Sequence, residues 1–195
     1  MPAATPDHPI LDVIPRRWSP YAFTPRTVER EKLLSCFEAA RWAASSFNEQ
    51  PWSFLVAFRE QEAEFAKMLD CLVEANQAWA KNVGVLILTV TRSRFQKNEK
   101  PNRVALHDLG AAAAHFALQA AELGLQAHQM AGVELEKVRT TYSIPEGYQP
   151  QTAIALGYPD PKPGDSEFAQ RDAGPRKRKT VQQQVFSGTW EQPAF

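Results

Sequence analysis

The chain has 195 residues, of which 44% are apolar and 23% charged, an ordinary balance for a globular protein with a real core. Its 22 basic residues match its 22 acidic residues, so no global field would attract nucleic acid, and we expect no nucleic-acid partner. No apolar run approaches the ~20 residues that span a bilayer, so we also expect no membrane association. The two cysteines lack metal-ligand spacing and the N-terminus lacks a signal-peptide pattern, which together predict buried free thiols, no metal site and a cytoplasmic protein.

The first half of the chain alternates helical and extended patterns. Thr27 can cap a helix, because apolar residues recur at helical spacing after it. A short apolar run bounded by charges is typical of a strand. In chain order, the sequence predicts a Pro-rich arm over 1–15, a helix over 27–44, a polar loop over 45–51, a strand over 52–58, a helix over 60–72, a short helix over 76–82 and a buried strand over 83–90.

The second half continues the alternation. It predicts a loop over 92–102, the longest helix over 104–123, a strand over 125–130, a short helix over 134–142, a strand over 151–156, an extended surface segment over 159–175 and a C-terminal segment over 176–195. One stripe of the longest helix holds mostly small residues: Leu106, Leu109, Gly110, Ala113, Ala117 and Ala120. Such a stripe suits either internal packing or a subunit interface. The alternation predicts one layered α/β or α+β domain over 1–195.

The first candidate binding motif is Arg16-Arg17-Trp18-Ser19, ahead of the first long helix. Two guanidiniums and a hydroxyl close together suit a phosphate, because arginine offers paired planar donors. By itself the motif is also what a chance surface pair of arginines would look like. No G-x-G-x-x-G fingerprint accompanies it, so a Rossmann dinucleotide site is not expected.

The second candidate motif is the segment ASSFNEQPW at 44–52, between a helix and a strand. The side chains of Ser45, Ser46 and Asn48 could serve both the donors and the acceptors of a heteroaromatic ring. The alternative is a loop of ordinary turn-forming residues.

Taken together, these two segments resemble the nitroreductase family. RRWSPYAF is similar to that family's Arg-x-Ser motif, and ASSFNEQPW is similar to its P-S-S-x-N-x-Q-P-W segment. Further similarities follow in order, in NQAWAKNVGVLILTV, GAAAAHFALQAAELGLQAHQMAG, TAIALGYP and RKRKTVQQQV, and they cover roughly residues 10 to 190. The resemblance implies an α+β, three-layer fold with a central mixed sheet flanked by helices. It also implies a homodimer in which residues 176–195 extend onto the partner subunit, with flavin mononucleotide (FMN) at the interface.

The resemblance also implies roles for particular residues. The phosphate and ribityl contacts would come from Arg16, Arg17, Ser19, Arg176 and Arg178. The partner subunit would contribute Ser45, Ser46 and Asn48. The ring itself would face the amide of Asn76 and the backbone N–H groups of Ala131 and Gly132, the glycine allowing close approach.

Two positions depart from the family pattern. Tyr21 stands where many members, and Trp79 where some members, carry a cation near the N1 and O2 edge of the ring, so we expect altered redox tuning. No catalytic triad is expected, because the cofactor carries the chemistry. His107 and Asp108 are adjacent on a predicted helix, where neighbours do not face each other, so we interpret them as structural.

The sequence therefore predicts an oxidoreductase that transfers hydride from NAD(P)H, through FMN, to a nitro-aromatic, quinone-like or related small-molecule acceptor by a ping-pong mechanism. The missing cations leave a second interpretation open, a flavin-binding carrier or sensor without reductase turnover. A scaffold that binds no flavin is the third.

Overall fold

The centre of the molecule is a four-stranded sheet. The computed structural model describes residues 4–162 and 164–195. The strands are β1 (Trp52–Phe58), β2 (Val85–Arg92), β3 (Gln126–Met130) and β4 (Tyr148–Gly157), in the order β1-β2-β4-β3. Every neighbouring pair is antiparallel. The expected mixed sheet is therefore wrong for the strands of this chain, because β4 inserts between β2 and β3 and runs opposite to both.

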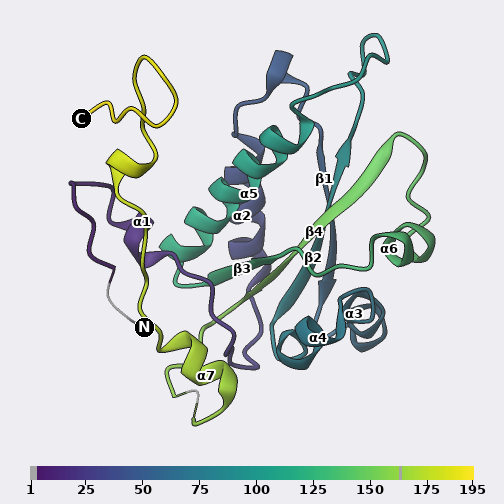
Figure 1. The fold of residues 1–195 in the computed structure, drawn as a ribbon. Coiled ribbons are helices and arrows are strands. Elements are labelled where there is room, and N and C mark those ends of the chain that lie inside the picture. The colour runs from purple at the N-terminus through teal and green to yellow at the C-terminus, as the bar shows by residue number, and fades with distance from the viewer. Residues whose placement is uncertain (1–3, 163) are drawn as a thin grey trace.

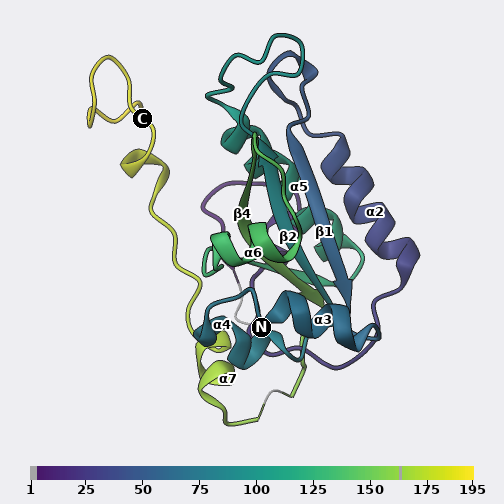
Figure 2. The same ribbon diagram turned by 90° about the vertical axis from the view of Figure 1, so that its right-hand side faces the viewer.

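Helices cover both faces of this sheet (Figures 1 and 2). They are α1 (Val13–Arg16), α2 (Arg30–Arg41), α3 (Glu62–Leu69), α4 (Glu74–Ala80), α5 (Ala105–Glu122), α6 (Leu135–Thr141) and α7 (Glu167–Asp172), with short 3₁₀ turns at Ser46–Asn48 and Val181–Gln183. The α+β layered fold is confirmed. Among the described residues, no helix is both long and apolar enough to cross a bilayer.

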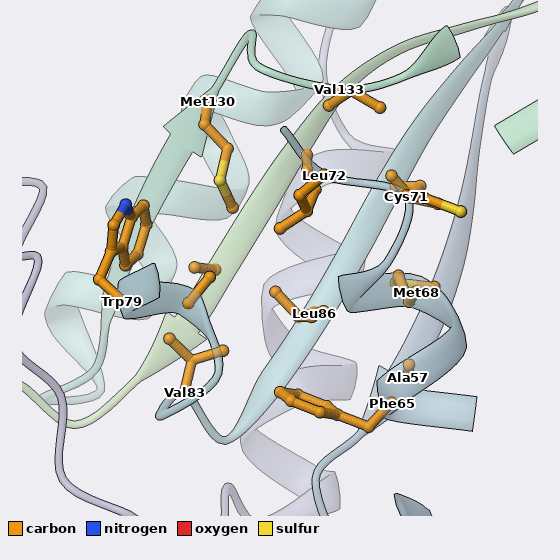
Figure 3. Close-up of a cluster of buried hydrophobic side chains, with 14 of the residues drawn as sticks. Ala57, Phe65, Met68, Cys71, Leu72, Trp79, Val83, Leu86, Met130 and Val133 are labelled. Atoms are coloured by element: carbon orange, nitrogen blue, oxygen red, sulfur yellow. The ribbon is translucent and has the colours of Figure 1, made fainter. Parts of the chain in front are cut away.

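Strand β2 divides the core in two, because its successive side chains point to opposite faces. Val85 and Ile87 pack under α2 and α5, whereas Leu86 and Leu88 pack under α3 and α4. All four side chains are buried. Figure 3 shows the second layer, where Trp79 of α4 and Met130 of β3 close the end nearest the N-terminal segment. Both cysteines are buried free thiols, as expected.

Three local predictions differ from the structure. Helix α2 begins at Arg30 rather than just after Thr27, and its cap residue, Glu29, makes no side-chain capping bond. The segment expected to be extended over 159–175 contains α7, whose first turn is capped by the Ser166 hydroxyl. The N-terminal arm contains α1, which contacts α5. Short helices such as α1 and α7 carry too few periodic residues to stand out in a sequence, and tertiary contacts stabilise them.

The small-residue stripe on α5 serves mainly internal packing. Leu109, Ala113, Ala117 and Ala120 are buried, and α5 packs closely against α2. Leu106 is 58% exposed and Gly110 is exposed one turn later, so the N-terminal end of the stripe faces outward.

Candidate functional site

A basic pocket forms where the N-terminal segment meets the start of the C-terminal segment. Arg17, Arg176 and Arg178 line a hollow of about 420 Å³ together with Ser19. The same three arginines border a second hollow of about 620 Å³ on the side of the N-terminal arm. The Arg17 Nη1 group lies 3.4 Å from the Ser19 hydroxyl. The structure therefore brings together four residues that the sequence motifs place about 160 positions apart.

Ion pairs do not neutralise Arg17, Arg176 and Arg178. Within the described chain, none of these three arginines lies within salt-bridge distance of a carboxylate. The hollow is also lined by Arg171, which is ion-paired, and by Asp172. Burial lowers the pKa of Arg17, and the neighbouring Arg176 and Arg178 lower it further. Burial and Arg178 act on the pKa of Arg176 in the same direction. Unpaired, partly buried cations of this kind favour an anion as ligand.

Backbone anchors fix the pocket before any ligand arrives. The Arg176 guanidinium donates to the carbonyl oxygens of Pro15 at 2.6 Å and Arg17 at 2.7 Å. The Asp172 carboxylate accepts from the N–H groups of Tyr21 and Ala22, at 2.9 to 3.0 Å. Arg176 is thus a positioning residue as well as a source of charge.

Strand β3 also holds the N-terminal segment in place. The Gln126 side chain accepts from Trp18 N–H at 3.0 Å and donates to Arg16 O at 3.1 Å. Two residues further along the same face, His128 Nδ1 lies 2.7 Å from Pro20 O. The side chains of β3 thus bond to the backbone of the N-terminal segment, where a neighbouring strand would bond through its own backbone. No sequence motif marked Gln126, His128 or Asp172, and the only signal for the first two is their spacing of two residues on β3.

Arg16 is not brought to the basic pocket. Its guanidinium pairs with Glu122 at the end of α5, and its Nε donates to Asp12 O at 3.3 Å. It borders a separate hollow of about 330 Å³ beside Trp18. Arg16 is the last residue of α1 and Arg17 is the first extended residue after it, so the two side chains leave the backbone in different directions and only Arg17 lines the pocket.

The other polar motif forms a tight turn at residues 45–50, which we call the turn. Phe47, Asn48 and Gln50 all adopt positive φ, near 50°. The Ser45 hydroxyl accepts from Gln50 N–H at 3.0 Å, and Ser46 N–H donates to the buried Asp108 carboxylate at 3.0 Å. In both Figures 1 and 2 the turn lies at the upper end of the fold, away from α1 and the start of the C-terminal segment. One subunit does not bring Ser45, Ser46 and Asn48 to its own basic pocket.

Asn76 and Gly132 lie side by side, but for a different reason than the sequence suggested. A Cβ atom on Gly132 would stand 2.4 Å from Asn76 Nδ2 and 2.6 Å from Val73 Cγ2. The glycine is therefore required by the close approach of α4, whatever lies on the other side. Asn76 Nδ2 donates to Gly132 O at 3.1 Å, which leaves its Oδ1 as an acceptor. The N–H of Gly132 donates to no other group in the described chain, and Ala131 is exposed beside it.

Tyr21 and Trp79, the two departures from the family pattern, lie in one aromatic cluster with His128. Their ring centroids are 5.2 Å apart, and each lies within 4.7 Å of the His128 ring. Trp79 is only 2% exposed and belongs to the core. Burial lowers the pKa of His128. The neutral imidazole thus packs as an aromatic ring while its Nδ1 faces Pro20 O.

The expectation that His107 and Asp108 do not face each other, because they are neighbours on a helix, is wrong. His107 Nδ1 lies 3.2 Å from Asp108 Oδ1, although the residues are adjacent. They sit in the first turn of α5, where Asp108 reaches sideways to Ser46 and so brings its second oxygen toward His107. The His107 side chain is 82% exposed. The bond from Ser46 N–H to Asp108 anchors the turn. A structural role for the pair of His107 and Asp108 stays our prediction.

Comparison with known proteins identifies the family of this chain. A model of the Nitroreductase family matches residues 14–158. A protein of Methanothermobacter thermautotrophicus named after NADH dehydrogenase and NAD(P)H nitroreductase activities is 31% identical over 170 residues, 84% of each chain. The major NAD(P)H-flavin oxidoreductase of Aliivibrio fischeri is 30% identical over 96 residues, 47% of this chain and 43% of that one. A solved structure described as an oxidoreductase containing FMN superposes with a TM-score of 0.88, at 33% identity and 95% coverage of both chains. The chain belongs to the Nitroreductase family.

Proposed function

We propose that this protein is an NAD(P)H-dependent oxidoreductase that holds FMN and reduces nitro-aromatic, quinone-like or related acceptors. The basic pocket carries the proposal. Arg17, Arg176, Arg178 and the Ser19 hydroxyl converge there, and these three guanidiniums form no ion pair in the part of the chain described, so they suit a terminal phosphate. A phosphomonoester carries roughly two negative charges near neutral pH, which these cations balance. The FMN and NAD(P)H in the names of the relatives support the same assignment.

The residues of the chain bind and orient, and the cofactor supplies the redox chemistry. Bound FMN would supply two-electron transfer from NAD(P)H to the acceptor. For a nitro group, one NAD(P)H and one proton give the nitroso product, water and NAD(P)⁺. Arg17, Arg178 and Ser19 would hold the phosphate, and Arg176 holds the backbone at Pro15 and Arg17 in place. The N–H groups of Ala131 and Gly132 and the Oδ1 of Asn76 would contact the ring.

The same proposal assigns the turn to the neighbouring subunit. Because the turn and the basic pocket lie apart within one chain, Ser45, Ser46 and Asn48 reach a flavin only if they come from a second copy. The C-terminal segment supports a homodimer: it leaves the body of the fold in Figure 2, with Trp190 and Phe195 more than 80% exposed. Light scattering should give twice the chain mass. Removal of residues 181–195 should cause dissociation or aggregation, and a stable flavin-loaded monomer would contradict the homodimer.

A flavin carrier or sensor is the second candidate, and one observation favours it. Neither Tyr21 nor Trp79 carries the cation that many family members have near the ring, and Trp79 is buried in the core. Steady-state NAD(P)H oxidation separates the two candidates. A reductase oxidises NAD(P)H in proportion to the acceptor added, whereas a carrier or sensor does not.

The visible spectrum of the freshly purified protein tests the common basis of both. We expect the absorption of oxidised flavin, and chromatography of the released cofactor should identify FMN. FAD in place of FMN, or no flavin after reconstitution with excess FMN, would refute the proposal.

A further inference from the structure

A second hollow lies at the upper end of the fold, between the turn and the loop that follows β2. This loop folds back as a hairpin over residues 93–101, closed by a bridge between Arg94 and Pro101 and by the bond from Phe95 N–H to Lys100 O. The hollow has a volume of about 590 Å³, and its lining includes Phe47, Phe95, Lys97 and Lys100. It shares no residue with the basic pocket.

Two aromatic rings form one wall of this hollow. Phe47 and Phe95 meet edge to face, with centroids 5.8 Å apart and planes at 81°. Phe47 is 90% exposed, which is unusual for so large an apolar side chain. An exposed ring face offers a stacking surface to a planar ligand.

The backbone holds Phe47 in this exposed position. Its φ of 53° is unfavourable for a bulky residue and persists only where neighbouring contacts impose it. Those contacts are the bond from Ser46 N–H to Asp108 and the bond from Gln50 N–H to the Ser45 hydroxyl. A third bond, from Gln96 N–H to Glu49 Oε1, joins the hairpin to the turn. Strain maintained in this way is typical of a binding site.

The charge in the hollow is positive. Lys97 and Lys100 form no ion pair with any carboxylate that the structure describes. Glu49 also lines the hollow and accepts the Gln96 N–H bond, so two lysines face one carboxylate, while Glu99 pairs with Arg92. Two ammonium groups beside two ring faces suit a planar aromatic molecule that carries a negative charge.

We propose that this hollow is the acceptor subsite and that it selects planar aromatic acceptors with an anionic substituent, such as a carboxylate or sulfonate. The inference rests on the proposed function. Phe47 lies between Ser46 and Asn48, the residues assigned to the flavin, so a molecule stacked on Phe47 lies next to the cofactor. The phosphates of NAD(P)H present a related chemistry, and the test below separates the two.

The test compares 4-nitrobenzoate with the neutral, similarly sized 4-nitrobenzyl alcohol. In the double variant Lys97→Gln/Lys100→Gln, kcat/KM for the anion should fall about two- to fivefold per charge removed, mainly through KM. The value for the alcohol should not change. Phe95→Leu should weaken both acceptors alike. Calorimetric titration of 4-nitrobenzoate into the oxidised FMN-loaded protein should show the same loss of affinity in the double lysine variant.

Lys137→Gln on α6 is the matched control, because it removes one lysine charge outside the hollow and should leave the ratio of the two acceptors unchanged. Absence of FMN, or absence of turnover with the neutral acceptor, refutes the proposed function itself. An FMN-loaded protein that reduces the alcohol, but whose preference for the anion is absent or unaffected by the lysine variants, overturns the inference alone. If the double lysine variant instead raised KM for NADPH more than KM for NADH, the hollow would bind the reductant. That result would also overturn the inference.

Discussion

The basic pocket and the turn differ in which parts of the sequence form them and in the energetic cost that each carries. The basic pocket joins two segments at opposite ends of the sequence, and its three arginines lie close together in spite of their mutual repulsion. The turn comes from six consecutive residues, and its energetic cost is backbone strain at three non-glycine residues with positive φ. In each region a carboxylate holds the backbone: Asp172 accepts from Tyr21 and Ala22, and Asp108 accepts from Ser46.

This difference suits the proposed division of one site between two copies of the chain. A pocket defined by charge would bind the phosphate end of the cofactor and tolerate small errors of position, because Coulomb attraction falls off slowly with distance. A turn that presents hydroxyl, amide and ring groups must be placed accurately, and a strained but well-anchored backbone achieves this. The predictions below test that division, beginning with the largest expected effect.

A mixed dimer tests the division most directly. One chain carries Arg17→Ala/Arg178→Ala and the other Ser45→Ala/Asn48→Ala. If each site combines the basic pocket of one subunit with the turn of its partner, the mixed dimer has one intact site and one site with both defects. The damaged site should lose roughly 3 kcal/mol or more, over a hundredfold in affinity. Fluorescence titration should then find one tightly bound FMN per dimer. Two weakened sites, one with only the arginine defect and one with only the turn defect, would mean that both regions serve the same flavin from one chain.

Single arginine variants test which arginines bind the phosphate of FMN. Arg17→Ala or Arg178→Ala should weaken FMN binding by about 1.5–3 kcal/mol, the range for hydrogen bonds to charged groups. Arg16→Ala serves as the control, because Arg16 pairs with Glu122 and does not line the pocket. Equilibrium dialysis at fixed salt gives the three dissociation constants. Equal losses for Arg16 and Arg17 would refute our assignment of the phosphate site.

The Asp172 anchor should matter for stability as well as for binding. In Asp172→Asn the amide offers one acceptor oxygen where the carboxylate now receives N–H bonds on both of its oxygens. We expect the free energy of unfolding in urea to fall by about 1–2 kcal/mol. Glu167→Gln on the same helix breaks an exposed ion pair and should change stability by less than about 0.5 kcal/mol. Similar effects of the two substitutions would show that Asp172 does not anchor the segment.

The smallest expected effect concerns pH. Burial lowers the pKa of His128 below its value in the unfolded chain, which is near 6.5. Below that pH the unfolded state binds the additional proton, so stability decreases as the pH falls through 6.5 toward the lower pKa of the folded protein. In His128→Gln this part of the acid sensitivity should disappear. Melting curves at fixed protein concentration between pH 7.5 and 5 measure the difference, and parallel curves for parent and variant would exclude His128 as its source.

Sequence patterns determined much of the fold because local rules govern those parts. The apolar run around Val85 to Val90 could only be a buried strand, and the Ala-rich stretch from 105 to 122 could only be a long helix. The short helices α1 and α7 escaped these rules, because their stability comes from tertiary contacts and not from periodicity.

The candidate site divides in the same way. Residue types suggested that Arg17 and Ser19 suit a phosphate and that the serine-rich turn suits a heteroaromatic ring, and the resemblance to the nitroreductase family joined them into one predicted flavin site. Only the tertiary structure could decide that Arg16 points away to Glu122 and that Gly132 is required by the approach of Asn76. Likewise, only the fold brings Gln126, His128 and Asp172 to the N-terminal segment, across more than 100 residues of sequence. Such contacts depend on which surfaces meet when the layers pack, and the sequence around each residue carries no trace of its distant partner.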